Sequence, residues 1–149
     1  MKTVFDPATY DELVRRITAL RPDSPRQWGK MNPSQMLEHT ARVLEMATGR
    51  KPSKQMFIGK MISWAVRGKF LGEEPFMKNA PTGPDFVITD QPNFAMTKTR
   101  VIGLLQELHQ LGEQGTDGHV HGFFGPLTGA QWGQTQFKHV DHHLRQFDV

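Results

Sequence analysis

The stretch TGAQWGQTQFKHVDHHLRQF, residues 128–147, has the pattern of a complete amphipathic helix and carries three of the chain's seven histidines. Thr128 is followed three residues later by Gln131, the spacing of a capping box, in which two side chains satisfy free backbone N–H groups at a helix start. Apolar residues such as Trp132 and Val140 then recur at helical spacing. The stretch predicts a helix with one face in a core and histidines at the edge of that face.

Three further segments show the same periodicity. Residues 6–20 begin with an Asp-Pro pair, and residues 32–48 begin with an Asn-Pro pair followed by Gln35, which are strong helix-start signals. A third segment begins near Asn93 and ends between two glycines, at 112 and 115. Four amphipathic helices, with a long connection between the second and the third, predict an all-α fold: an up-down four-helix bundle with a long crossover.

Size and composition narrow the functional classes. With 149 residues the chain is long enough for one domain with its own core, and we expect a single domain over residues 1–149. The formal net charge is only +3, and no module of basic and stacking aromatic residues is evident, so nucleic acid is not an expected partner. Neither a signal peptide nor a membrane-spanning run is apparent, which makes a cytoplasmic location the expectation. The chain has no cysteine, so a metal would need histidine or carboxylate ligands.

The connections between these helices differ in character. Residues 50–69 hold six basic and no acidic side chains among many apolar ones. We expect a helical turn or two there, capping one end of the core with its lysines in solvent. Residues 70–93 are rich in proline and predict a long irregular connection that covers something or has a function, with residues 85–89 in an extended conformation. Residues 115–127 predict a glycine-rich loop.

Two histidines of the last helix have the spacing of metal ligands. His139 and His143 are four residues apart and therefore lie on one helix face, whereas His142 points about 100° away from His143. Seven histidines in 149 residues give about 0.3 such pairs by chance, so the pair alone is weak evidence. His39, beside the apolar stripe of the second helix, is the natural third ligand. The alternative is a row of hydrogen-bonded histidines in a bundle seam.

The chain also resembles a known superfamily. WGKMNPSQMLEHT (28–40), PFMKNAPTGPDF (75–86) and HGFFGPLTGAQWGQTQFKHVDHHLRQF (121–147) are similar to the DinB-like superfamily of metalloenzymes, and more closely to a branch of it whose function is unknown. The resemblance implies a four-helix bundle, often a homodimer. It also implies one metal ligand from the second helix, His39, and two from the fourth, His139 and His143.

Such a centre would act on a small-molecule substrate. The resemblance implies a metal-dependent transferase that uses a low-molecular-weight thiol, or a hydrolase, and nitrogen ligands suit zinc, nickel or iron alike. Gln35, Trp132 and Gln136 are candidates for lining the pocket, although the two glutamines could equally fill the seam and a place in the core is the favoured interpretation for Trp132. His121 is a weak candidate for an acid–base group. No carboxylate presents itself as a general base, because Glu38 and Asp141 do not share a face with the ligands next to them.

A second class of function stays open at this point. The chain could be a binding module without turnover, with or without a metal, that contacts a partner or an anionic membrane surface through residues 50–69. The capping role of this segment is the simpler expectation, and membrane binding is the less favoured one.

Overall fold

The computed structural model describes residues 1–149 and is mostly helical, as predicted. Its α-helices are α1 (Pro7–Ala19), α2 (Pro33–Ala47), α3 (Phe57–Leu71), α4 (Phe94–Thr116) and α5 (Gly129–Arg145). Two short strands, β1 (Val120–His121) and β2 (Gly125–Pro126), and a 3-10 turn, η1 (Pro84–Phe86), complete the secondary structure. No helix is long and apolar enough to cross a membrane.

The predicted helix starts are the observed ones. The Asp6 carboxylate accepts a hydrogen bond from the backbone N–H of Thr9 at the start of α1. The capping boxes at Asn32 and Thr128 are both formed, so each satisfies two backbone donors that would otherwise lack a partner. Helix α4 is interrupted near its C-terminal end at Gly112. The φ of Gly112 is 62°, which lies in the left-handed region that glycine adopts without strain.

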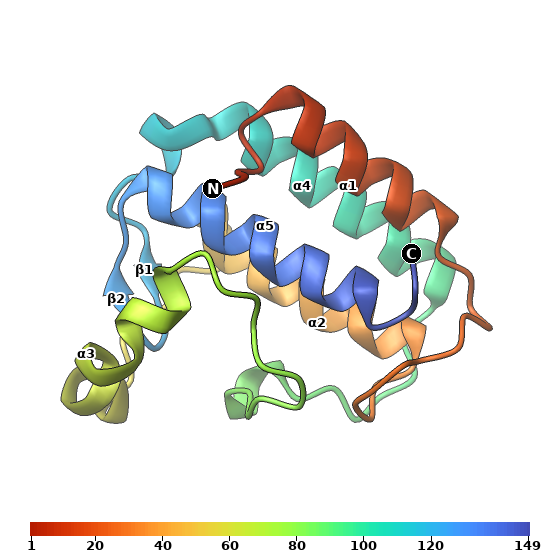
Figure 1. Ribbon diagram of the computed structural model, residues 1–149, viewed down its shortest axis with the longest axis horizontal. Coiled ribbons are helices and arrows are strands. Elements are labelled where there is room, and N and C mark those ends of the chain that lie inside the picture. The colour runs from red at the N-terminus through yellow and green to blue at the C-terminus, as the bar shows by residue number, and fades with distance from the viewer.

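The four helices predicted from periodicity pack around one core. Figure 1 shows α1, α2, α4 and α5 lying alongside one another, with α1 beside α4 and α5 beside α2. Large apolar side chains from all of these helices and from the C-terminal tail are fully buried, among them Leu13, Leu37, Leu105, Trp132 and Phe147. Burial of these side chains is the main stabilising contribution, because each removes a large apolar area from water.

The connections depart from the sequence predictions in three places. The segment 50–69 does not cap the core with a turn or two: it forms most of α3, a 15-residue helix in which only Gly59 is buried. The glycine-rich loop contains a small antiparallel hairpin that pairs Val120 with Pro126. Residues 85–89 form no strand, and Pro84–Phe86 make a single 3-10 turn instead.

The segment between α3 and α4 does cover something, as its length suggested. It lies along α2, where Arg42 donates to the carbonyl of Asp85 (3.0 Å) and Gln35 donates to that of Asp90 (3.2 Å). This contact brings the carbonyl of Phe86 to the middle of α2, beside His39.

Candidate metal centre

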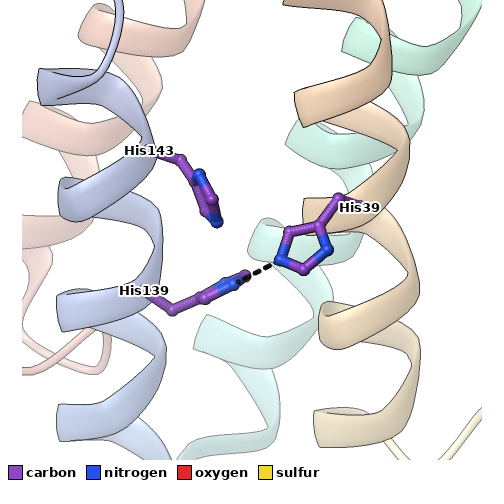
Figure 2. A group of neighbouring side chains, drawn as sticks. All are labelled: His39, His139 and His143. Atoms are coloured by element: carbon purple, nitrogen blue, oxygen red, sulfur yellow. Dashed lines mark hydrogen bonds between the residues drawn. The ribbon is translucent and has the colours of Figure 1, made fainter. Parts of the chain in front are cut away.

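Three histidines from two helices converge at the centre of the fold. His39 lies on α2, and His139 and His143 lie one turn apart on α5 (Figure 2). One nitrogen from each ring lies within 4.8 Å of the other two. His39 and His143 are buried residues, and His139 is intermediate in exposure although its Nδ1 atom is buried. The structure thus brings together the three residues that the sequence singled out.

Hydrogen bonds orient two of the three rings. Nδ1 of His39 lies 2.9 Å from the backbone carbonyl of Phe86, and Nδ1 of His143 lies 3.0 Å from the side-chain oxygen of Gln146. A carbonyl oxygen can only accept, so both Nδ1 atoms carry the proton, and both Nε2 atoms keep a free lone pair. An outer hydrogen bond of this kind is typical of histidines that bind a metal.

The third ring is less well satisfied. Nε2 of His139 lies 2.9 Å from Nε2 of His39, whereas Nδ1 of His139 is buried and has no hydrogen-bond partner. The side-chain oxygen of Gln136, one turn earlier on α5, is also buried and unpartnered. Buried polar atoms without partners are uncommon, because each loses its hydrogen bonds to water. Because Nε2 of His39 can only accept, Nε2 of His139 carries the proton in this arrangement, and its Nδ1 is a buried acceptor without a donor.

Burial keeps the cluster uncharged. It lowers the pKa of His39, lowers that of His139 well below its ordinary value, and lowers that of His143 to about 3. Mutual repulsion is the next contribution for His139, from His143, and for His143, from His39. All three rings are therefore neutral at neutral pH, which is the form that binds metal ions.

The donor set fits a divalent transition metal. Three nitrogens around a tetrahedral ion at about 2.0–2.1 Å lie roughly 3.3–3.4 Å apart, a spacing that falls between the shortest approach seen here, 2.9 Å, and the 4.8 Å limit of the group. No carboxylate belongs to the group. Asp141 pairs with Arg16 and Arg145, and Glu38 pairs with Arg42 and Arg100. These acidic residues form ion pairs beside the site and do not enter it.

The other residues singled out from the sequence lie outside the cluster, as expected for His142 and as the core interpretation of Trp132 predicted. Gln35 does not line the cluster: its side chain accepts from the backbone N–H of Asn32 in the capping box. Trp132 is fully buried in the core, and its indole N–H donates to the carbonyl of His119. His142 is only half-buried and lies near Trp28, outside the group of three. Gln146 was missed, although its position three residues after His143 could have indicated it.

His121 supports the hairpin. Its Nδ1 accepts hydrogen bonds from the backbone N–H groups of Phe123 and Phe124, at 3.1 and 3.2 Å, within the hairpin. Burial, and then the nearby Arg67, lower the pKa of His121 to about 4. Because the lone pair of Nδ1 is already used by two donors, the ring holds the hairpin together. Its catalytic role stays a prediction.

A cavity lies next to the histidine cluster and does not include it. It has a volume of about 120 Å³ and lies between residues 73–76 and α5, where Phe76, Lys138 and His142 are among its lining residues. None of the three clustered histidines lines it.

The comparisons with known proteins identify a family. The model of DUF1569, described as a protein of unknown function, matches residues 5–149. The chain therefore belongs to this family, and the expectation of a family without an assigned function is confirmed. No curated protein and no solved structure matches the chain.

Proposed function

We propose that this DUF1569 protein is a metal-dependent enzyme that binds one divalent ion through His39, His139 and His143. The observation that carries the proposal is the convergence of three neutral imidazoles, two of which are held by carbonyl oxygens in the tautomer that leaves Nε2 free. When bound, such an ion would act as a Lewis acid that activates water, a thiol or a carbonyl group.

A hydrogen-bonded seam without metal explains less of the structure. A seam would be expected to satisfy its buried polar atoms, yet Nδ1 of His139 and the side-chain oxygen of Gln136 have no partners. For its Nε2 to face an ion, His139 needs its proton on Nδ1, which an ion bound at Nε2 would favour over the present contact with His39.

The reaction class comes from the resemblance to the DinB-like superfamily. The packing of α1, α2, α4 and α5 supports a four-helix bundle of that type, with a ligand from the second long helix and two from the fourth. We propose a transferase that brings a low-molecular-weight thiol to an electrophilic small molecule, or a hydrolase of a small molecule.

Elemental analysis tests the metal centre directly. Protein purified without a polyhistidine tag or chelators is compared with His39→Ala, His139→Ala and His143→Ala, and with His142→Ala as the matched control. We expect close to one equivalent of zinc, nickel or iron in the unmodified protein and the control, and loss of the metal in each of the three variants. Circular dichroism shows whether the variants remain helical.

Two results would contradict the proposal. Absence of metal after reconstitution with zinc, nickel and iron would leave the cluster as a seam. Equal loss in His142→Ala would show that the ligand set is wrong. With the metal established, pairs of thiols and electrophiles can be screened for turnover that requires both the ion and His139.

A further inference from the structure

The outer face of α3 is the largest exposed apolar feature of the molecule. Exposed side chains there include Phe57 (77%), Trp64 (78%) and Met61 (59%), together with Ile58 and Ile62. Figure 1 shows α3 projecting from the body formed by α1, α2, α4 and α5. The five side chains expose on the order of 600 Å², if each offers roughly 150–250 Å² in full. This equals the largest patches on typical monomers, which usually mark an interaction site.

The opposite face of α3 is already used. A side chain at Gly59 would collide with the backbone carbonyl of Phe123, so helix and hairpin are in direct backbone contact there. Arg67 donates to the carbonyl of Phe124 at 2.8 Å, and the ring of Phe70 stacks on that of Phe124 with centroids 4.0 Å apart. The helix is therefore attached by its inner face, and its apolar outer face is held outward.

The C-terminal end of α3 is fixed to α5 by a buried lysine. The ammonium group of Lys138 donates to the carbonyls of Phe70 (2.9 Å) and Gly72 (2.6 Å). A cation at this position satisfies carbonyls that the helix leaves free and complements the negative end of its dipole. With both ends held, α3 cannot rotate to bury its apolar face without breaking these contacts.

The charges along α3 and the segment before it have one sign. Residues 46–72 contain no Asp or Glu. Lys54, Lys60 and Lys69 are exposed and form no ion pair. The other basic residues of the segment are engaged: Arg50 pairs with Glu107 and Lys51 with Glu45. Three free cations therefore accompany the apolar face, and they favour an anionic partner.

We infer that α3 docks this protein on an anionic lipid surface. Exposed Trp and Phe with flanking lysines are typical of a helix that lies in the membrane interface, where the rings enter the acyl boundary and the ammonium groups reach the phosphates. A 15-residue helix is about 22 Å long, too short to span a hydrocarbon core of about 30 Å, so it would lie in the plane. A second copy of the chain fits less well, because it would bring the free lysines of both helices together.

Vesicle sedimentation tests this inference without reference to the metal. We expect the protein to bind vesicles of phosphatidylcholine with phosphatidylglycerol, to release them at high salt, and to bind pure phosphatidylcholine weakly. The triple variant Phe57→Ser, Met61→Ser, Trp64→Ser should lose binding. The matched control Val87→Ser, Met96→Ser removes two other exposed apolar side chains and should bind normally.

The lysines provide an independent measurement. Replacing Lys54, Lys60 and Lys69 by Gln should lower partitioning onto anionic vesicles on the order of 100-fold, because each lysine near such a surface contributes about a fivefold factor. The inference is overturned if anionic vesicles are not bound, if neutral ones are bound equally well, or if the triple serine variant binds unchanged. It is also overturned if the protein binds no vesicle and light scattering shows a dimer that the triple serine variant dissociates.

Discussion

Acid should destabilise the metal-free protein through His121. In the folded state the pKa of this ring is lowered to about 4, mainly by burial, against an ordinary value of 6.5. Between these values the unfolded chain binds a proton that the folded chain does not, so the free energy of unfolding falls as the pH falls from 6.5 towards 4. From pH 7.5 to 4.5 the loss from this residue is about 2.5 kcal/mol.

The variant His121→Asn isolates this contribution. Its amide oxygen can still accept from the hairpin N–H groups, whereas it does not titrate. Urea unfolding followed by circular dichroism, with chelator present, gives the free energy of unfolding of both proteins at pH 7.5 and at pH 4.5. We expect the pH-dependent loss to be smaller in the variant by about 2 kcal/mol. Any pH-independent effect of the substitution cancels in this double difference.

The reasoning is refuted if both proteins lose the same free energy of unfolding on acidification. That result would mean that His121 titrates alike in the folded and unfolded chains. Its ring would then not be enclosed by the hairpin and the aromatic residues around it. A uniform loss of stability in the variant, seen as a lower unfolding midpoint at every pH, does not affect the comparison across pH.

Two further predictions concern the residues that orient the clustered histidines and the glycines within helices. Gln146→Leu removes the acceptor that orients His143 and should weaken metal binding, measured by titration calorimetry, about 10–100-fold. Unchanged affinity in this variant would exclude the orienting role. Gln136→Leu should also weaken binding if the Gln136 oxygen accepts from His139 when the metal is bound. Gly103→Ala should stabilise α4 by roughly 0.5–1 kcal/mol, because the added methyl group meets no atom within 4 Å. Gly133→Ala on α5 should destabilise the fold, because its methyl group would collide with Thr3 and Phe5. Equal thermal midpoints for the two variants would contradict this packing.

The helical class and the pairing of His139 with His143 could be read from the sequence because both depend on local spacing. Capping boxes at Asn32 and Thr128 act within four residues, and they set the observed helix starts. His139 and His143 share a face in any α-helix, whatever surrounds it. The third member, His39, needed only the assumption that two amphipathic helices place their apolar stripes in the same core.

Other features depended on which segments meet in space. The partner of His39 is a backbone carbonyl 47 residues away, and no side-chain pattern marks a carbonyl. Gln35 looked like a pocket residue because it shares a face with His39, but the free N–H groups of the helix start compete for its side chain. Gln146 was overlooked because it lies beyond the last ligand, where the tail turns back onto the core.

The segment 50–69 shows the limit most clearly. Its composition, apolar and basic, was evident from the sequence, and so was the choice between capping the core and facing outward. That choice rests on tertiary contacts: the backbone approach at Gly59, the bonds from Arg67 to the hairpin and those from Lys138 to the end of α3. The sequence by itself determined the four core helices and the pairing of His139 with His143, because these follow from spacing within a helix. Only the tertiary structure decided which face of α3 meets solvent, because that depends on partners far away in the chain.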